Sequence, residues 1–266
     1  MKRLLSVALF IGFLPLLGMA QSDFDGTWKV DLTKSTMPDK PHVFLLQNGT
    51  YQCKTCVPPI NLKADGQDHS VAGSPYCDAV AVKVLDDRSI EITKKKNGRV
   101  VATSKMVVSA DGSTVTFEFT DNTNNTSAPV VGKGVMTRVA KTKRPPTGAH
   151  LISGSWRTSK MESLSDNALT FTFKADGENL NMTNPMGQSY TAKLDGTDAP
   201  YKGDLGINSV SILRLGKDTF METDKRDGKA ITTKRFMVTP VDGKTMTVIV
   251  GDDLTGAATV LAAAKQ

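Results

Sequence analysis

Three cysteines carry the most reactive chemistry that this sequence offers. Cys53 and Cys56 lie in the run Cys-Lys-Thr-Cys-Val-Pro-Pro, and Cys77 follows in the same half of the chain. Neighbouring thiols in an oxidising compartment convert to disulfides. A Cys53–Cys56 bridge requires a turn, because an extended strand would hold the two Cα atoms farther apart than about 7 Å. A bridge from either residue to Cys77 is the second interpretation.

Metal or redox roles for these thiols are the remaining alternative. His42 or His69 could join the three cysteines, since three cysteines and one histidine form an accepted zinc ligand set. A thioredoxin-like role would need the motif at a helix N-terminus within a βαβ pattern, which nothing in the sequence supplies. We therefore expect a disulfide, no bound metal and no cofactor.

Other catalytic patterns are missing from the sequence. There is no Gly-x-Ser-x-Gly, no His-Glu-x-x-His and no phosphate-binding glycine loop. The acidic pairs at 86–87 and 252–253 fall near turns, where solvated carboxylates are usual. The formal net charge of +6 is spread along the chain, and the lysine run at 94–96 precedes an Asn-Gly turn. We expect neither an enzyme nor a nucleic-acid-binding protein.

The first twenty residues resemble a targeting segment. Lys2 and Arg3 form a basic start, residues 4–17 are an apolar run, and Gly18-Met19-Ala20 is a small-x-small cleavage site. The apolar run is shorter than the roughly 20 residues of a spanning helix. No cysteine follows the cleavage point directly. We expect a signal peptide over 1–20, no membrane span, and a secreted or periplasmic protein that is not a lipoprotein.

The rest of the chain repeats itself at an offset near 130. Residues 63–108 match 193–238 without a gap at twelve of 46 positions, among them Asp65, Gly66 and Gly73. Such duplication indicates two similar modules. We place the first repeat at 21–140, a basic, proline-bearing linker at 141–150, and the second repeat at 151–266.

Turn and strand patterns predict an all-β fold. Nine Asp-Gly or Asn-Gly pairs, which suit tight hairpin turns, punctuate the chain, and alternating apolar segments such as 114–119 and 245–250 lie between them. Residues 257–264 are expected to form a strand. We expect short strands between the turns, about eight per repeat. Closure removes exposed edges, so we expect two tandem antiparallel up-and-down barrels.

The start of each repeat resembles the lipocalin and calycin barrels. Gly26-Thr27-Trp28 and Gly154-Ser155-Trp156 contain the only two tryptophans of the chain, and Arg138 lies near the end of the first repeat. In that family an arginine near the last strand lies over the tryptophan ring and helps close the barrel floor, which implies a contact between Arg138 and Trp28. The second repeat departs from the pattern, because the residue aligned with Arg138 is Ala263. We expect Lys265 to take the place of the arginine there.

The whole chain is also similar to a group of secreted bacterial two-repeat lipocalin-like proteins of unsettled activity. The residues that carry this resemblance are Cys53-Lys-Thr-Cys56-Val-Pro-Pro and Ser109-Ala-Asp-Gly112. The resemblance implies a fold and no particular activity.

The barrel interiors are where we expect function to lie. An eight-stranded barrel is wide enough for side chains or for one small ligand. Methionine adapts to irregular apolar shapes, and the second repeat is rich in it. We expect a non-catalytic binding protein for a small apolar or amphipathic molecule, the alternative being a structural or partner-binding envelope protein with filled barrels. The expected pocket residues are Met182, Met221, Met237, Met246 and Tyr201.

Overall fold

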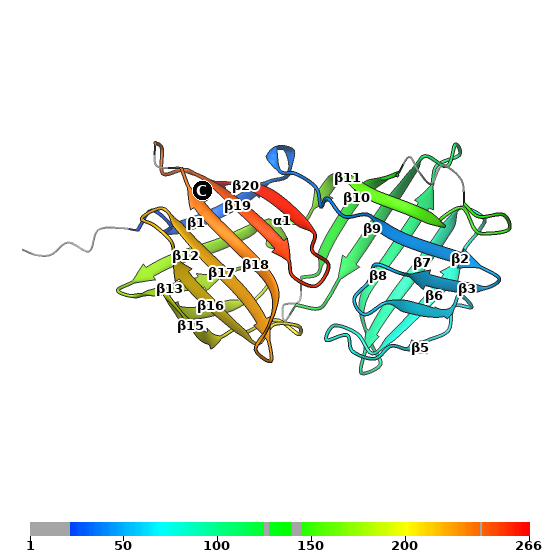
Figure 1. Ribbon diagram of the computed structural model, residues 1–266, viewed down its shortest axis with the longest axis horizontal. Coiled ribbons are helices and arrows are strands. Elements are labelled where there is room, and N and C mark those ends of the chain that lie inside the picture. The colour runs from blue at the N-terminus through cyan, green and yellow to red at the C-terminus, as the bar shows by residue number, and fades with distance from the viewer. Residues whose placement is uncertain (1–21, 125–127, 140–144, 240) are drawn as a thin grey trace, which may run out of the picture.

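The fold is built almost entirely from antiparallel strands. The computed structural model describes residues 22–124, 128–139, 145–239 and 241–266. Within these ranges twenty strands form two sheets of ten strands each, and each sheet curls into a nearly closed barrel (Figure 1). The predicted all-β class and barrel-like arrangement are confirmed. The predicted count of eight strands per barrel is wrong, because each barrel has ten.

The sheet that we call the first barrel consists mainly of strands from the first repeat. In sequence order its strands are β2 (His42–Gln47), β3 (Thr50–Cys53), β4 (Ile60–Lys63), β5 (His69–Ser70), β6 (Ala79–Val84), β7 (Ser89–Lys96), β8 (Arg99–Val108), β9 (Thr114–Asp121), β10 (Val130–Arg138) and β11 (Gly154–Leu164). Their order across the sheet is β4-β3-β2-β11-β10-β9-β8-β7-β6-β5.

The second barrel repeats this plan in the second half of the chain. Its strands are β1 (Gly26–Asp31), β12 (Thr170–Asp176), β13 (Asn179–Thr183), β14 (Ser189–Lys193), β15 (Asp195–Pro200), β16 (Ser209–Arg214), β17 (Thr219–Arg226), β18 (Lys229–Val238), β19 (Thr245–Asp252) and β20 (Ala258–Lys265). A 3-10 turn, η1 (Leu32–Lys34), and the short helix α1 (Asp166–Leu169) lie on the two connections between the barrels. The expected strand over 257–264 is confirmed as β20.

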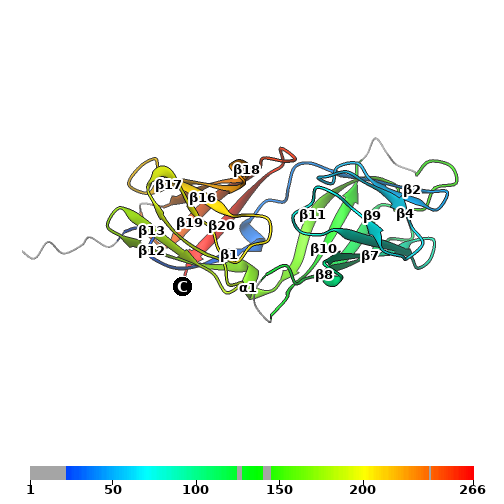
Figure 2. The same cartoon turned by 90° about the horizontal axis from the view of Figure 1, so that it is seen from below.

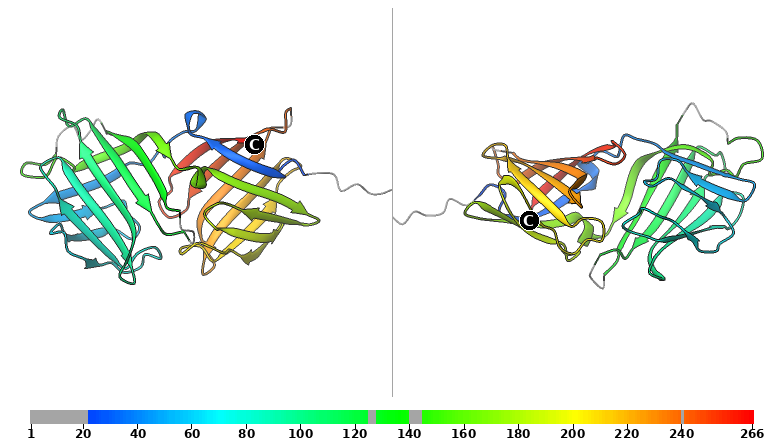
Figure 3. Two further views of the ribbon diagram at one scale, coloured as in Figure 1. Left: turned by 180° about the vertical axis from the view of Figure 1, so that it is seen from behind. Right: turned by 60° about the horizontal axis from the view of Figure 1, so that its bottom comes forward.

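Each repeat gives its first strand to the other barrel. Strand β1 lies between β12 and β20 in the second barrel, and β11 lies between β2 and β10 in the first. In Figure 1 the blue strand β1 accordingly lies between the yellow-green β12 and the red β20, and the chain then crosses to the other barrel. Figures 2 and 3 show the same exchange from other sides. The sheets therefore do not follow the predicted ranges 21–140 and 151–266 at these two strands.

The exchange also changes the partners of the two tryptophans. The guanidinium carbon of Arg138 lies 3.9 Å from the ring centroid of Trp156, and Lys265 Nζ lies 4.9 Å from that of Trp28. The implied contact between Arg138 and Trp28 is therefore wrong, since the arginine covers the tryptophan of the other repeat. Lys265 pairs with Trp28 in the sheet as Arg138 pairs with Trp156, so Lys265, rather than Ala263, is its structural equivalent.

Both barrel floors are closed by the same hydrogen-bond pattern. Each tryptophan is fully buried and donates from its indole nitrogen to a carbonyl oxygen four residues earlier, Phe24 for Trp28 and Ile152 for Trp156. Arg138 donates in addition to the carbonyl oxygens of Gly112, Leu151 and Ser153.

The glycine before each tryptophan makes this arrangement possible. Gly26 and Gly154 have φ of +128° and +143°, a conformation that side chains rarely adopt. A Cβ atom at Gly154 would also lie 2.3 Å from an Arg138 guanidinium nitrogen. The Gly-x-Trp pattern is thus a structural requirement of the floor.

The spacing of the strands explains why ten strands replace the expected eight. From β2 to β8 successive strands begin 8 to 10 residues apart, because strands such as β4 and β5 have only four and two residues. Several predicted hairpin turns have the backbone that they require: Asn48, Asn97 and Asp227 have φ near +50°, each followed by a glycine with positive φ. Alternation along the strands then fills each barrel with its own apolar core.

Candidate ligand cavity

The second barrel encloses a cavity of about 280 Å³. Three phenylalanines from two strands line its wall: Phe171 and Phe173 on β12 and Phe236 on β18. The rings of Phe173 and Phe236 meet edge to face with centroids 5.2 Å apart, as aromatic pairs prefer. Strand alternation turns these side chains inward. The remaining lining side chains are Val30, Ala168, Thr170, Met182, Asn184, Met186, Gln188, Tyr201, Glu222, Lys234, Val248, Val250 and Leu261.

A buried ionic cluster lies against this apolar wall. Glu222 and Asp224 on β17 are 2% and 0% exposed, and Lys234 on the neighbouring strand β18 reaches both. Lys234 Nζ lies 2.7 Å from Glu222 Oε1 and 2.6 Å from Asp224 Oδ2. The hydroxyl of Tyr190 on β14 donates to the other oxygen of Glu222. Two carboxylates therefore share one ammonium inside the barrel.

The shared ammonium does not neutralise both acids. Burial raises the pKa of Asp224 to about 7, an effect that Lys234 reduces and Glu222 reinforces. Burial opposes the charge on Lys234, but Asp224 and Glu222 outweigh it and hold its pKa well above the usual range. Burial, together with Glu222, also raises the pKa of Tyr190. Near pH 7 the cluster thus contains a charged lysine and a neutral tyrosine, and Asp224 is close to the midpoint of its titration.

A hydrogen-bonded chain of polar side chains lines one end of the cavity. Gln188 Oε1 accepts from Asn184 Nδ2 at 2.7 Å and from the Tyr201 hydroxyl at 3.3 Å. Gln188 Nε2 donates to Asp204 Oδ2 at 2.8 Å. Asp204 Oδ1 also accepts from the hydroxyl of Tyr76, a residue of the first barrel, at 3.3 Å. One barrel therefore helps to order the cavity of the other.

Gly206 makes room for this contact. A Cβ atom there would lie 2.1 Å from Cζ of Tyr76, so the tyrosine ring packs directly on the glycine backbone. At the repeat offset of 130 these two residues correspond to each other. The corresponding loops of the two repeats meet, and only one of them carries the ring.

The structure places the expected pocket residues in three environments. Met182 and Tyr201 line the cavity. Met246 is 1% exposed in the core of the second barrel without lining the cavity. Met221 and Met237 alternate with the buried Phe220 and Phe236, and so lie on the opposite face of the sheet. For these last two, the prediction of an inward position is wrong.

Sequence reasoning missed the ionic cluster. Glu222 and Asp224 have the same parity as the buried Phe220 in β17, and Lys234 has the same parity as Phe236 in β18. Charged residues in phase with buried aromatic residues are the signal that could have identified them. The prediction used the number of methionines and not the face of the strand on which each residue lies, so it did not identify the cluster.

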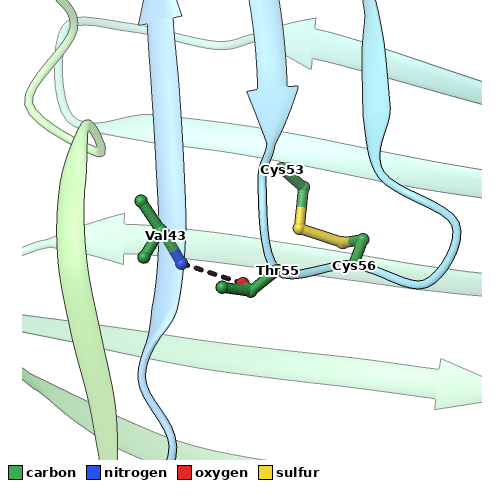
Figure 4. The surroundings of a disulfide bond; sticks show 4 residues. All are labelled: Val43, Cys53, Thr55 and Cys56. Atoms are coloured by element: carbon green, nitrogen blue, oxygen red, sulfur yellow. Dashed lines mark hydrogen bonds between the residues drawn. A yellow bond between two sulfur atoms is a disulfide. The ribbon is translucent and has the colours of Figure 1, made fainter. Parts of the chain in front are cut away.

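The cysteine loop lies on the first barrel. Cys53, at the end of β3, and Cys56 form a disulfide with their Cα atoms 5.4 Å apart, and Cys77 is a free, buried thiol. The expected disulfide is confirmed as the Cys53–Cys56 bridge. Thr55 Oγ1, inside the loop, accepts a hydrogen bond from the backbone N–H of Val43 on β2 (Figure 4). The loop is thereby fixed to the neighbouring strand.

A larger cleft of about 540 Å³ lies between the barrels beside this loop. The connection between β1 and β2 contributes Pro38 and Pro41 to it, the first barrel contributes Val57, and the β19–β20 hairpin of the second barrel contributes Val250 and Leu254. A smaller cavity of about 300 Å³ continues towards Cys77 and Lys94.

Comparisons with known proteins assign no family. Neither a protein-family model nor a curated protein matches the chain. Within the residues described, no group of three or more histidine, cysteine or acidic side chains is arranged to hold a metal ion. A search of the same residues finds no helix with the length and apolar character needed to cross a membrane. Residues 1–20, for which a signal peptide is predicted, lie outside the residues that the structure describes.

Proposed function

We propose that this chain is a secreted or periplasmic lipocalin-like binding protein that holds one small apolar or amphipathic molecule in its second barrel. The observation that carries this proposal is a cavity with an aromatic wall and a few convergent polar groups, the usual character of small-molecule sites. At about 30 Å³ for each water-sized group, 280 Å³ has room for on the order of nine non-hydrogen atoms.

Calorimetric titration of the full chain with toluene and with 1-octanol tests this proposal. Both molecules suit the size of the cavity, so we expect saturable binding of one molecule per chain and a higher thermal midpoint in its presence. Absence of binding by both probes would refute the proposal.

A filled-cavity variant locates the binding. Phe236→Trp enlarges a lining side chain and should abolish binding of both probes. Met106→Trp is the matched control, because Met106 pairs with Ile90 in the first barrel as Phe236 pairs with Phe220 in the second. Equal loss of binding in the two variants would place the probes elsewhere.

The alternative is a structural or partner-binding envelope protein. The cleft of about 540 Å³ between the barrels favours it, because proline and aliphatic side chains from both barrels form its walls. Under this alternative Phe236→Trp would leave function intact, whereas Leu254→Lys in the cleft would remove partner binding.

A further inference from the structure

We propose that the molecule held in the second barrel carries a neutral hydroxyl or carbonyl group that accepts a hydrogen bond from Lys234, and that the site rejects carboxylates and amines. This inference rests on the proposed function and adds the chemistry of the ligand's polar group.

The available donor is the ammonium of Lys234. An ammonium has three N–H donors, and the cluster contains two acceptors for them, Glu222 Oε1 and Asp224 Oδ2. The side chain of Lys234 is 24% exposed, against 2% and 1% for those of Glu222 and Asp224, and it lines the cavity. One N–H is therefore left for an acceptor inside the cavity.

The charge of the cluster excludes an anionic ligand. One ammonium between two carboxylates has a net charge of −1 when both acids are ionised and of zero when Asp224 is protonated. A ligand carboxylate would add a further negative charge within this buried group without a cation of its own. Burial of a charge that lacks a partner is strongly unfavourable.

The acceptors of the cluster are not available to an amine. Glu222 accepts from Lys234 with one oxygen and from Tyr190 with the other. Asp224 Oδ1 has no hydrogen-bond partner, but Asp224 is completely buried and does not line the cavity, so a ligand amine does not reach this oxygen. Lys234 is the most exposed charge of the cluster, so a ligand ammonium in the cavity would lie beside a like charge, and this repulsion opposes the attraction of the two more deeply buried acids. A neutral acceptor on the ligand accepts from the free N–H of Lys234. It brings neither the unpaired charge of a carboxylate nor the like-charge repulsion of an ammonium.

The test compares three probes that share one apolar chain. The full-length protein is titrated by calorimetry at pH 8 with 1-octanol, octanoate and 1-aminooctane. We expect 1-octanol to bind more than about tenfold tighter than either charged probe, a difference of about 1.4 kcal/mol or more. Equal or tighter binding of octanoate or of 1-aminooctane would overturn the inference while leaving the proposed function standing. Binding of none of the three would refute both.

Variants of the acids should change the order of affinity. Asp224→Asn removes one negative charge, so the gap between 1-octanol and octanoate should shrink at least threefold. Glu222→Gln combined with Asp224→Asn leaves Lys234 without an anionic partner, and octanoate should then bind tighter than 1-octanol. Asp198→Asn, in an exposed pair with Lys225 on the same barrel, is the control and should leave the order unchanged. An unchanged order in the double variant would contradict the assignment, and if it does not fold, the wild-type series decides alone.

Discussion

The two barrels share one plan and differ in a few inward positions. In the first barrel Ile92 on β7 pairs with Ser104 on β8, and the corresponding pair in the second barrel is Glu222 with Lys234. Ile92 belongs to an apolar core, whereas Glu222 belongs to a buried ionic cluster beside a cavity. The same frame therefore accepts an apolar or an ionic interior, and the ionic interior is the one that calls for a functional explanation.

The ionic cluster also costs stability that the pair of Ile92 and Ser104 does not. Buried ion pairs often stabilise a protein no more than apolar residues of similar size, because both charges lose their hydration. In the second barrel the imbalance is greater, since two acids share one lysine. We infer that this barrel gives up stability to place a polar group beside its cavity, and four predictions test the contrast with the first barrel.

Loss of the shared ammonium should have the largest effect. Lys234→Met leaves two buried carboxylates without a cation, and we expect a loss of about 3–5 kcal/mol in the free energy of unfolding, measured by urea denaturation. Lys133→Met, which breaks an exposed pair with Glu118 on the first barrel, is the control and should cost about 0–1 kcal/mol. Similar losses in the two variants would contradict the special status of the cluster.

Removal of either tryptophan should destabilise the barrel of the other repeat. Trp28→Ala and Trp156→Ala should each cost about 3–5 kcal/mol, because both rings are fully buried. The location of the effect is the sharper prediction. Hydrogen exchange should increase first in β12 and β20 for Trp28→Ala, and first in β2 and β10 for Trp156→Ala. The reverse pattern would argue against the strand exchange.

Replacement of the disulfide should have a moderate effect confined to the first barrel. Cys53→Ser together with Cys56→Ser opens a short covalent loop, for which chain entropy predicts a loss of roughly 2 kcal/mol. Octanol affinity in the second barrel should not change. An altered affinity would mean that the cysteine loop is coupled to the cavity.

Asp224 should produce a dependence of stability on pH, which is the smallest of the four effects when it is expressed per pH unit. Its pKa is about 7 in the folded protein and 3.8 in the unfolded chain, so the folded state binds more protons between these values. Stability should therefore fall as pH rises from 5 to 7, by at most about 1.4 kcal/mol per unit. Asp224→Asn should flatten this slope in urea denaturation at several pH values, and Asp198→Asn should not.

Other carboxylates, such as those of Asp31 and Asp111, have lowered pKa values, and they do not change the stability between about pH 5 and 7. They contribute stability that is lost only as pH falls below the ordinary range for aspartate. A slope that persists in Asp224→Asn would assign the effect to another group.

Local patterns predicted the frame of this molecule well. The Gly-x-Trp starts, the Asx-Gly turns and the alternation in segments such as 245–250 follow from short-range backbone and packing rules, and the structure contains them. The exchange of β1 and β11 could not be predicted in this way, because identical starts fit either barrel equally well. The choice depends on long-range pairing, of β1 with β12 and β20 and of β11 with β2 and β10.

Methionine content predicted a pocket in the second repeat, and a cavity lies in the barrel that this repeat mainly forms. Its lining contains the three phenylalanines Phe171, Phe173 and Phe236 beside two methionines, so methionine content alone does not explain it. The roles of Glu222 and Lys234 depend on cross-strand register, which joins residues twelve positions apart in sequence. This register depends on the pairing of the whole sheet, so the sequence of either strand alone does not determine it.

The crossed first strands set an order on folding during synthesis. Strand β1 leaves the ribosome before any other, but one of its neighbours is β20, the last strand of the chain. The earliest segment must therefore wait, unpaired or temporarily paired with β2 or β10, until translation is complete. A nascent chain that stalls in the second repeat would present this strand to other molecules, so rapid completion and chaperone protection matter more here than in a pair of independent barrels.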